Sequence, residues 1–310
     1  MRIVVMGAGG TGGFFGAKLA RAGEDVTFVA RGAHLEAIRS RGLRVKSASE
    51  GEWVVKAPAV DRLDGVAPAD LVLFCVKSFD TESAGQAIVP VLGPDTGVLS
   101  IQNGVDNEEK LEAIVGKGRV LGGIAQVFAT IESPGVIQHT LLGRIQFGEM
   151  DGGESARARA FLEACGRAQI PCELSPDVLR TLWGKYVYLV AHAGMTALTR
   201  CPAGVIRALP ETRELYRRLL EEMAALARAA GADLGPGIVD TCMGYLDALG
   251  ANGYSSLHYD LTHGKRLEID ALQGHAVRLG ERYGVATPML FAVYAALRPY
   301  RDGPPEAVKS

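Results

Sequence analysis

Short apolar runs alternate with amphipathic segments along the first half of the chain. Runs of strand length, rich in Val, Ile and Leu, indicate buried strands, and the segments after them carry apolar residues at helical spacing. The strands are predicted at residues 2–6, 26–30, 43–46, 53–56, 70–76, 98–102, 119–130, 136–140 and 144–148. The helices between them are predicted at residues 14–21, 34–40, 82–92 with an interruption near Pro90, 107–115 and 155–167. This alternation predicts a mostly parallel sheet covered by helices.

The pattern changes near residue 175, beyond which strand-like alternation is almost absent. Ser175-Pro176-Asp177 predicts a helix start, with Ser175 as the capping residue and Pro176 in the first turn. Helices are predicted at residues 176–198, 210–230, 237–248, 267–283 and 288–297. We therefore expect an α/β N-terminal domain at residues 1–174, followed by an all-α C-terminal domain at residues 175–310.

Length, charge and cysteine content narrow the class of protein. The 310 residues are enough for two domains at roughly 150 residues each. The 33 Lys and Arg residues against 35 Asp and Glu residues leave a net charge of −2, which argues against a protein that clamps nucleic acid. Five scattered cysteines without a CxxC pair argue against zinc ribbons and redox dithiols, and no metal site is predicted. No signal-peptide pattern and no apolar run near the ~20 residues of a membrane helix are visible, so we expect a cytoplasmic protein with no membrane partner.

A glycine cluster follows the first predicted strand and opens the first predicted helix. The segment reads Gly7-Ala8-Gly9-Gly10-Thr11-Gly12 and matches GxGxxG. The first glycine of this pattern allows a tight turn, the second lets the backbone approach a pyrophosphate, and the third lets the helix pack closely on the strand. The helix N-terminus then faces the phosphates. Strand, loop and helix in this order predict that these six residues bind a dinucleotide; the alternative is a glycine-rich turn without a ligand.

The end of the second predicted strand bears on which dinucleotide binds. Enzymes that use NAD usually carry an acidic residue there for the ribose hydroxyls, whereas this chain reads Val29-Ala30-Arg31-Gly32. A guanidinium suits a 2′-phosphate. Arg31 therefore favours NADP(H), with a surface arginine in a turn as the alternative.

Two further polar residues follow strands at the sheet edge where open α/β folds bind ligands. Lys77 ends the most apolar strand, where a cation suits phosphate or ribose; otherwise it is a lysine that leaves the core for water. Asn103 precedes Gly104 directly after strand 98–102, in a common turn dipeptide. For Asn103 the turn and the contact with a ligand are compatible.

The helical half carries its own candidate residues. Lys185 lies in the mostly apolar helix predicted at 176–198. It either extends its ammonium group to water or points into a cleft, where its pKa would fall. Glu268 is predicted in the first turn of a helix, where an acid ordinarily compensates the dipole, and Ser255-Ser256 lies 12 residues upstream. From the residues alone, structural and functional roles are equally open for Glu268 and these serines.

Together these residues resemble the ketopantoate reductase (2-dehydropantoate 2-reductase) family over about residues 1–298. The order and spacing that carry the resemblance are those of Gly7–Gly12 with Arg31, Val76-Lys77, Ile101-Gln102-Asn103-Gly104, Leu182-Trp183-Gly184-Lys185 and Leu267-Glu268-Ile269-Asp270. The resemblance implies a Rossmann-type NADP-binding domain, a helical substrate and dimerisation domain, and an active site in the cleft between them. It implies NADPH-dependent reduction of a 2-oxo acid, with 2-dehydropantoate to (R)-pantoate in pantothenate biosynthesis as the leading reaction. A monomer and a homodimer are both open.

The resemblance also implies a role for each site residue. Lys185 falls on the family's general acid, and Glu268 on the glutamate that holds the substrate hydroxyl or orients the lysine. Ser256 falls on the serine that binds the substrate carboxylate, and Asn103 on the asparagine near nicotinamide and substrate. Lys77 falls on a lysine at the edge between cofactor and substrate.

The sequence departs from the family after the lysine. The pantothenate-pathway enzymes usually carry asparagines four and eight residues on, where this chain has Leu189 and Ala193, and Gly253 replaces a third polar residue. His192 lies roughly on the Lys185 face; it either replaces an asparagine contact to substrate or is a half-buried helix histidine. A paralogue that reduces a more apolar 2-oxo acid or ketone is therefore the alternative. A non-catalytic NADPH sensor is a remote one, and related two-domain dehydrogenases of 2-hydroxy acids or sugar acids are the alternative at the level of the fold.

Overall fold

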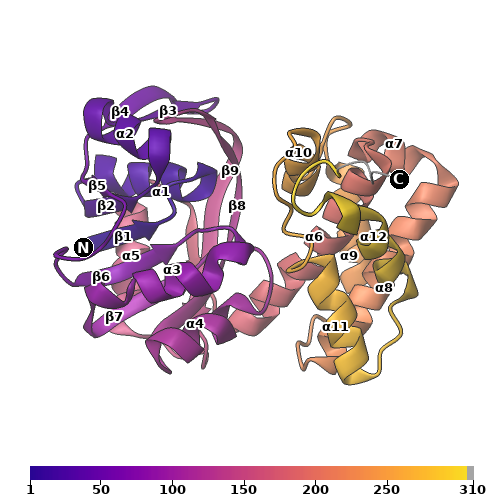
Figure 1. Cartoon of the computed structure of the whole chain (residues 1–310). Coiled ribbons are helices and arrows are strands. Elements are labelled where there is room, and N and C mark those ends of the chain that lie inside the picture. The colour runs from indigo at the N-terminus through magenta and orange to yellow at the C-terminus, as the bar shows by residue number, and fades with distance from the viewer. Residues whose placement is uncertain (306–310) are drawn as a thin grey trace, which may run out of the picture. The chain divides into compact units, whose positions relative to one another are not determined.

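The computed structural model describes residues 1–305. Its contacts divide the chain into two compact units, Met1–Thr181 and Leu182–Ser310, of which the first is α/β and the second helical (Figure 1). The predicted fold class, a Rossmann-type α/β domain followed by an all-α domain, is confirmed. The division of contacts falls inside helix α6 (Val178–Thr199), and the functional division at residues 174 and 175 stays a prediction.

The first unit is built on one ten-stranded, mostly parallel sheet. The strand order is β4-β3-β9-β8-β7-β6-β1-β2-β5, and β10 pairs with β9. The antiparallel pairs recorded for the described residues are β3 with β4 and β8 with β9. The strands are β1 (Arg2–Met6), β2 (Asp25–Val29), β3 (Leu43–Ser47), β4 (Gly51–Val55), β5 (Ala59–Val60), β6 (Ala69–Phe74), β7 (Leu92–Ser100), β8 (Val120–Ser133), β9 (Val136–Glu149) and β10 (Cys172–Leu174).

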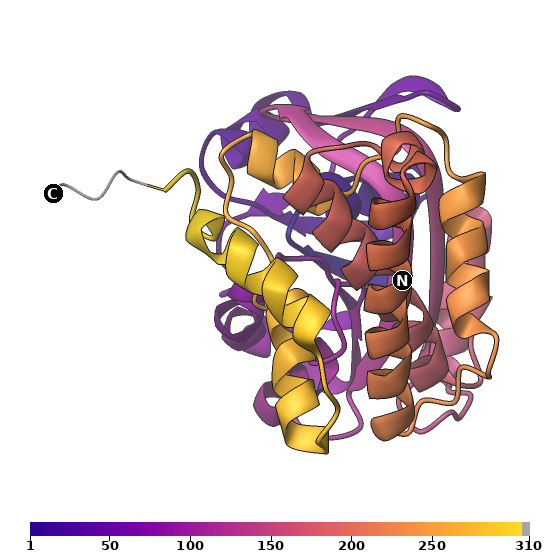
Figure 2. The same cartoon turned by 90° about the vertical axis from the view of Figure 1, so that its right-hand side faces the viewer.

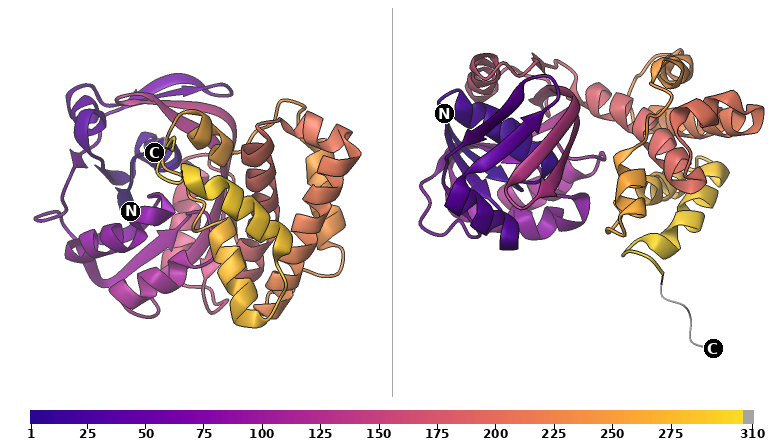
Figure 3. Two further views of the ribbon diagram at one scale, coloured as in Figure 1. Left: turned by 45° about the vertical axis from the view of Figure 1, so that its right-hand side comes forward. Right: turned by 90° about the horizontal axis from the view of Figure 1, so that it is seen from above.

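Helices cover both faces of this sheet (Figures 1 and 3). Strand β1 shows why, because successive side chains of a strand point to opposite faces. Ile3 and Val5 are buried in a core that includes residues of α1, α2 and α5, whereas Val4 and Met6 are buried in a second core with residues of α3 and α4. The helices and short 3-10 turns are α1 (Gly10–Arg21), α2 (Gly32–Arg41), η1 (Ser78–Asp80), α3 (Thr81–Ala87), η2 (Val89–Val91), α4 (Asn107–Val115) and α5 (Ala156–Arg167).

Two elements of the first unit differ from the prediction. The interruption expected near Pro90 in the helix at residues 82–92 begins earlier, since α3 ends at Ala87 and a 3-10 turn with Pro90 in its first turn follows it. The two strands expected at 136–140 and 144–148 are one strand, β9. The apparent gap is a local irregularity, where Leu142 has a φ of 61° and the pairing with β8 shifts register. The long hairpin continues through it because both flanks stay paired.

All regular elements in the described part of the second unit are helices, and it contains no strand (Figure 2). Besides α6, its elements are α7 (Ala203–Ala208), α8 (Pro210–Ala229), α9 (Ile238–Ala248), α10 (Ser256–Thr262), α11 (Gln273–Tyr283), α12 (Pro288–Leu297) and the 3-10 turn η3 (Arg298–Tyr300). Up to residue 305, none of the helices is long and apolar enough to cross a membrane.

Two helix starts of the second unit lie later than expected. Helix α6 begins at Val178, and Asp177 rather than Ser175 caps it, since the Asp177 carboxylate accepts the N–H of Arg180 at 2.9 Å. Helix α11 begins at Gln273 instead of residue 267. Glu268 therefore lies in a non-helical segment, and the expectation that it sits in the first turn of a helix is wrong.

Candidate active site

The loop between β1 and α1 gives each glycine of the GxGxxG pattern the conformation or space that the pattern requires. Gly7 has a φ of +97°, which favours glycine at this turn. A Cβ on Gly12 would lie 2.2 Å from the Gly7 carbonyl oxygen, so the third glycine allows the close packing of α1. A Cβ on Gly9 would meet nothing within 4 Å, which leaves this face of the loop open. The backbone of the loop therefore fits an approaching pyrophosphate.

Gly10 has a further requirement that the pattern does not show. It is the first residue of α1, followed by the partly buried Thr11. A Cβ on Gly10 would lie 2.0 Å from the carbonyl oxygen of Ala129 in β8. Only a glycine lets the helix N-terminus approach this strand so closely. No local signal predicts this contact, because the two residues are far apart in the sequence.

His34 in α2 fixes the same loop from a second side. Its Nε2 lies 2.8 Å from the carbonyl oxygen of Ala8, and the N–H of Gly135 donates to its Nδ1 at 3.0 Å. Nε2 must therefore carry the proton, and the ring is neutral. Burial lowers the pKa of His34, in keeping with this tautomer, while the bond to the Ala8 carbonyl raises it. Sequence analysis missed His34, which reads as one more polar residue of a helix.

Arg31 lies two residues after the end of β2, with its side chain 70% exposed. Its guanidinium lies 3.7 Å from the carboxylate of Asp80, which belongs to the turn η1. The cation is therefore accessible at the end of the second strand. This is the position that a 2′-phosphate would need.

Lys77 and Asn103 lie in neighbouring loops, as predicted. Strands β6 and β7 pair in parallel with Phe74 opposite Ser100, so the loops that follow them leave the same edge of the sheet. Lys77 is exposed and Asn103 is half-buried. Both loops then turn into helices, α3 and α4, that cover one face of the sheet. The structure thus brings these two residues together with the glycine loop at the carboxyl ends of the strands.

In the second unit, α6 carries Lys185 and a non-helical segment carries Glu268. Burial lowers the pKa of Lys185 to about 8, while the negative charge of Glu268 acts against this shift. Glu268 is buried, with 6% of its surface exposed. The pair combines a half-buried lysine whose pKa is lowered to about 8 with a carboxylate that favours the charged form of that lysine.

Neighbouring residues hold the Glu268 segment against α6 by hydrogen bonds to main-chain atoms. The hydroxyl of Tyr186 donates to the carbonyl of Leu272 at 2.7 Å. The side-chain amide of Gln273 donates to the carbonyl of Val190 at 2.8 Å. Neither residue could be found from the sequence, since a helical pattern does not show that Tyr186 of α6 bonds to Leu272 or that Gln273 of α11 bonds to Val190 of α6. They fix the backbone beside Glu268 relative to the turn of α6 that carries Lys185.

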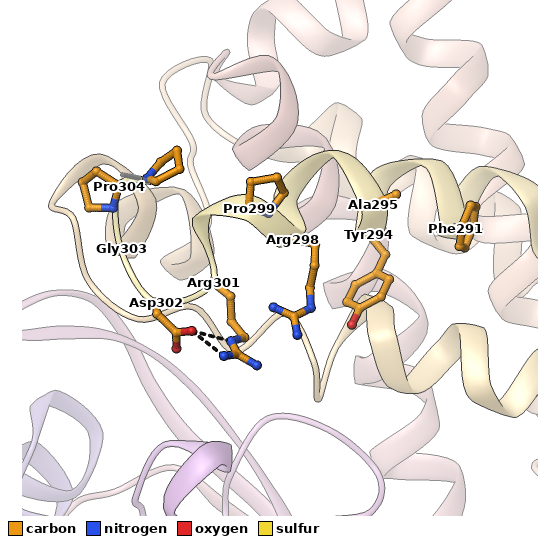
Figure 4. Close-up of a pocket in the computed structure, with 10 residues that line it drawn as sticks. Phe291, Tyr294, Ala295, Arg298, Pro299, Arg301, Asp302, Gly303 and Pro304 are labelled. Atoms are coloured by element: carbon orange, nitrogen blue, oxygen red, sulfur yellow. Dashed lines mark hydrogen bonds and ion pairs between the residues drawn. The ribbon is translucent and has the colours of Figure 1, made fainter. Parts of the chain in front are cut away.

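The same segment is held on its other side by the C-terminal helix and turn. The N–H of Leu267 donates to the carbonyl of Arg301 at 2.7 Å, and the Tyr294 hydroxyl donates to Asp270 at 2.8 Å. Tyr294 and Arg301 also line a hollow of about 810 Å³ on this unit (Figure 4). That hollow contains none of the predicted site residues. Two of its lining residues are thus also hydrogen-bonded to the segment that carries Glu268.

The positions that depart from the family's pattern are apolar in the structure too. Leu189 is half-buried one turn beyond Lys185, and Ala193 is fully buried. His192 is 5% exposed and stacks on Tyr188 with ring centroids 5.4 Å apart. Burial lowers the pKa of His192 to about 4, so its ring is neutral near pH 7. Contact between His192 and a substrate stays a prediction.

The two serines of Ser255-Ser256 have different surroundings. Ser255 is buried and caps α10: its hydroxyl accepts the N–H of His258 at 3.1 Å and lies 2.7 Å from the hydroxyl of Thr196. Ser256, the first residue of α10, is exposed. Its side chain is thus accessible to a carboxylate, and its predicted contact with substrate stays a prediction.

Comparison with known proteins gives a consistent family. The family model described as Ketopantoate reductase PanE/ApbA matches residues 3–152, and the corresponding C-terminal model matches residues 177–301. A 2-dehydropantoate 2-reductase of Mesorhizobium japonicum is 31% identical over 319 residues, covering 96% of this chain and 97% of the relative. The crystal structure of a PanE/ApbA family ketopantoate reductase from Ralstonia eutropha JMP134 is 33% identical, with a TM-score of 0.89, and covers 97% of this chain and 98% of that one.

One similar structure has a different substrate in its description. A D-mandelate dehydrogenase in ternary complex with NADH and anilino(oxo)acetate has a TM-score of 0.90, with 97% of this chain and 98% of that chain covered. At 22% identity it shows a shared fold alone. The two family models, by contrast, match well over half of the chain. This chain belongs to the ketopantoate reductase family of oxidoreductases.

Proposed function

We propose that this protein reduces a 2-oxo acid with NADPH, and that its leading reaction is 2-dehydropantoate to (R)-pantoate. The observation that carries the proposal is the pair formed by Lys185 and Glu268, in which a half-buried lysine with a pKa of about 8 is accompanied by a buried carboxylate. Membership of the ketopantoate reductase family supports it. The curated relatives named 2-dehydropantoate 2-reductase, which align over nearly their whole length, support the choice of substrate.

The first unit is suited to holding the cofactor. The open face at Gly9, the left-handed turn at Gly7 and the helix start at Gly10 form a cradle for a pyrophosphate. Arg31 is the group in this unit that would bind a 2′-phosphate, with Lys77 and Asn103 further along the same sheet edge. Bound NADPH supplies the hydride that is added to the ketone carbon of the substrate.

The second unit supplies the proton. As the ketone is reduced, negative charge develops on its oxygen, and the ammonium group of Lys185 stabilises that charge and donates a proton to the oxygen. Lys185 is left neutral and takes up a proton from water before the next turnover. Glu268 favours the charged form of the lysine and accepts a hydrogen bond from the product hydroxyl. Ser256 is proposed to hold the substrate carboxylate.

A specific observation favours a second substrate class. Leu189 and Ala193 replace two amide side chains on the face of α6 that carries Lys185. Without these hydrogen bonds a polar substrate loses about 1–3 kcal/mol for each contact, whereas a branched or aromatic side chain gains an apolar surface. The alternative function is therefore reduction of a more apolar 2-oxo acid or ketone by the same chemistry.

Steady-state oxidation of NADPH by the purified protein distinguishes these functions. The substrates are 2-dehydropantoate, pyruvate and bulky apolar 2-oxo acids, measured under the same conditions. We expect turnover with 2-dehydropantoate at a kcat/KM above that for the other acids. A higher kcat/KM for an apolar acid would support the alternative, and NADPH binding without turnover of any 2-oxo acid would contradict both.

Arg31→Ala tests the choice of cofactor. We expect the KM for NADPH to rise at least about tenfold, because a charged hydrogen bond to the 2′-phosphate is lost, while the KM for NADH stays the same. Arg62→Ala is the matched control, since Arg62 is an exposed arginine of the same unit that also pairs with a neighbouring aspartate, Asp64. An equal rise of both KM values in Arg31→Ala would show that Arg31 does not bind the 2′-phosphate.

A further inference from the structure

The loops that carry Lys77 and Asn103 are joined by buried polar side chains that none of the roles above uses. Gln102, Thr81 and Asn107 are 5%, 1% and 0% exposed. Gln102 lies after β7, Thr81 opens α3, and Asn107 opens α4. Buried polar groups of this kind are retained only when their hydrogen bonds are satisfied.

The bonds form one chain from loop to loop. The amide nitrogen of Gln102 donates to the Thr81 hydroxyl at 2.9 Å. The Thr81 hydroxyl lies 3.1 Å from the side-chain oxygen of Asn107. The amide nitrogen of Asn107 donates to the carbonyl of Asn103 at 3.0 Å. This series of hydrogen bonds thus begins at Gln102, next to Asn103 in the sequence, runs through Thr81 of α3, and ends on the main-chain oxygen of Asn103.

The same side chains also hold the main chain on both sides of Lys77. The second N–H of the Gln102 amide donates to the carbonyl of Val76 at 3.0 Å. The Thr81 hydroxyl lies 2.9 Å from the carbonyl of Ser78. The residues before and after Lys77 are therefore both held, and each bond ends on a backbone oxygen.

The direction of donation in these hydrogen bonds is fixed by the chemistry of the groups. A side-chain amide nitrogen can only donate, so the Thr81 hydroxyl must accept from Gln102 and has one hydrogen to give. That hydrogen goes to Asn107 or to Ser78, which share it. Gln102 therefore joins the two loops both directly, through its bond to the Val76 carbonyl, and by way of the Thr81 hydroxyl. None of the three side chains changes protonation state near neutral pH.

We infer that Gln102, Thr81 and Asn107 are positioning residues that set Lys77 and Asn103 at a fixed separation for the bound cofactor and substrate. This inference rests on the proposed function for the roles of Lys77 and Asn103. It goes further by assigning the cause of their alignment to three buried residues that have no proposed contact with cofactor or substrate. The geometry of the reacting groups then depends on these three side chains, since small displacements of positioning groups lower the rate steeply.

Thr81→Val tests this inference, because it keeps the shape of the side chain and removes the hydroxyl. Thr96→Val is the matched control. Thr96 is 2% exposed, accepts the N–H of Gly93 at 2.8 Å and donates to the carbonyl of Ala69, at the opposite edge of the same strands β6 and β7. Both variants lose a buried threonine hydroxyl with one accepted and one donated bond. Thr81→Ser restores the hydroxyl.

We expect Thr81→Val to lower kcat/KM for the 2-oxo acid at least tenfold and to raise the Kd of NADPH, while Thr81→Ser stays within threefold of the unchanged protein. Thr96→Val should leave both values within twofold, although it should lower the urea unfolding midpoint by as much as Thr81→Val does. Hydrogen exchange of the protein without ligand should rise in residues 75–79 and 101–106 together in Thr81→Val only. Gln102→Met removes the donors at the start of the chain and should give the same pattern if Thr81→Val does not fold.

Equal kinetic effects of Thr81→Val and Thr96→Val would overturn the inference, as would a Thr81→Ser variant as impaired as Thr81→Val. The proposed function is tested separately, by turnover of the unchanged protein in the same assay. If that turnover is absent, hydrogen exchange still decides the coupling: exchange that rises in only one of the two loops contradicts it.

Discussion

Lys185→Ala is expected to lower kcat for the 2-oxo acid by roughly a thousandfold, the usual effect of removing a general acid that also stabilises the developing charge. The Kd of NADPH should not change, because the cofactor is proposed to bind to the first unit. Lys265→Ala is the control, since Lys265 is an exposed lysine of the same helical unit that lies over the ring of Tyr259. Stopped-flow measurement of NADPH oxidation with saturating substrate gives the rate. Retention of more than a tenth of the rate in Lys185→Ala would contradict the assignment of the proton donor.

The pH dependence of the same rate tests the electrostatics of the pair. Burial lowers the pKa of Lys185 to about 8, and only the protonated amine can donate. The rate of reduction should therefore be full below pH 8 and fall as the pH rises through it. The charge of Glu268 raises the lysine pKa, so Glu268→Gln should move this fall to a lower pH. A fall at the same pH in both proteins would show that the carboxylate does not act on the lysine.

Gly12→Ala is expected to lower the stability of the protein, whereas Gly9→Ala is expected to weaken NADPH binding without loss of stability. A Cβ at Gly12 meets the Gly7 carbonyl oxygen at 2.2 Å and the Cys75 Cβ at 2.9 Å, neither of which can move away freely. We expect the free energy of unfolding to fall by about 3 kcal/mol or more, the upper end for overpacking. A Cβ at Gly9 meets nothing within 4 Å, so Gly9→Ala should unfold like the unchanged protein. Its Kd for NADPH should rise about a hundredfold, since the methyl group stands where the pyrophosphate approaches.

Urea unfolding and titration of NADPH fluorescence separate the two effects. Gly166→Ala is the control: Gly166 lies in α5, has open space around its Cβ position and a helical backbone. It should bind NADPH normally and be as stable as the unchanged protein, or slightly more. If Gly9→Ala bound NADPH normally, the loop would be a structural turn and the proposal of a dinucleotide site would be wrong.

The parts of the fold that local patterns determine could be predicted from the sequence. Strand β1, the glycine loop and α1 follow one another within about twenty residues, and the turn at Gly7 and the close packing at Gly12 are as predicted. The buried strand β6 was equally clear because parallel strands covered on both faces are apolar at nearly every position. The shared edge of Lys77 and Asn103 then follows from the rule that parallel strands end on the same side.

The parts that depend on contacts between distant residues could not be predicted. The pattern around Glu268 suits a helix, yet the segment is not helical. The N–H of Leu267 donates to the carbonyl of Arg301, and the carbonyl of Leu272 accepts from the Tyr186 hydroxyl of α6. Tertiary hydrogen bonds outweigh propensity there. The bond between Gln102 and Thr81 spans 21 residues, so no local pattern contains it. The sequence therefore indicated the side chains that we propose to react, but not the residues that we propose to align them.

The bonds that align these residues share one property with an evolutionary consequence. Tyr186 and Gln273 bond to the carbonyls of Leu272 and Val190, and Asn107 bonds to that of Asn103. A carbonyl is present whatever side chain stands at that position, so the accepting positions can mutate without loss of the bond. Side chains on the Lys185 face of α6 can accordingly be substituted while the hydrogen bonds that hold the backbone around the lysine are kept. This arrangement lets one scaffold exchange its substrate by few substitutions, and the apolar pair at positions 189 and 193 is the kind of change it tolerates.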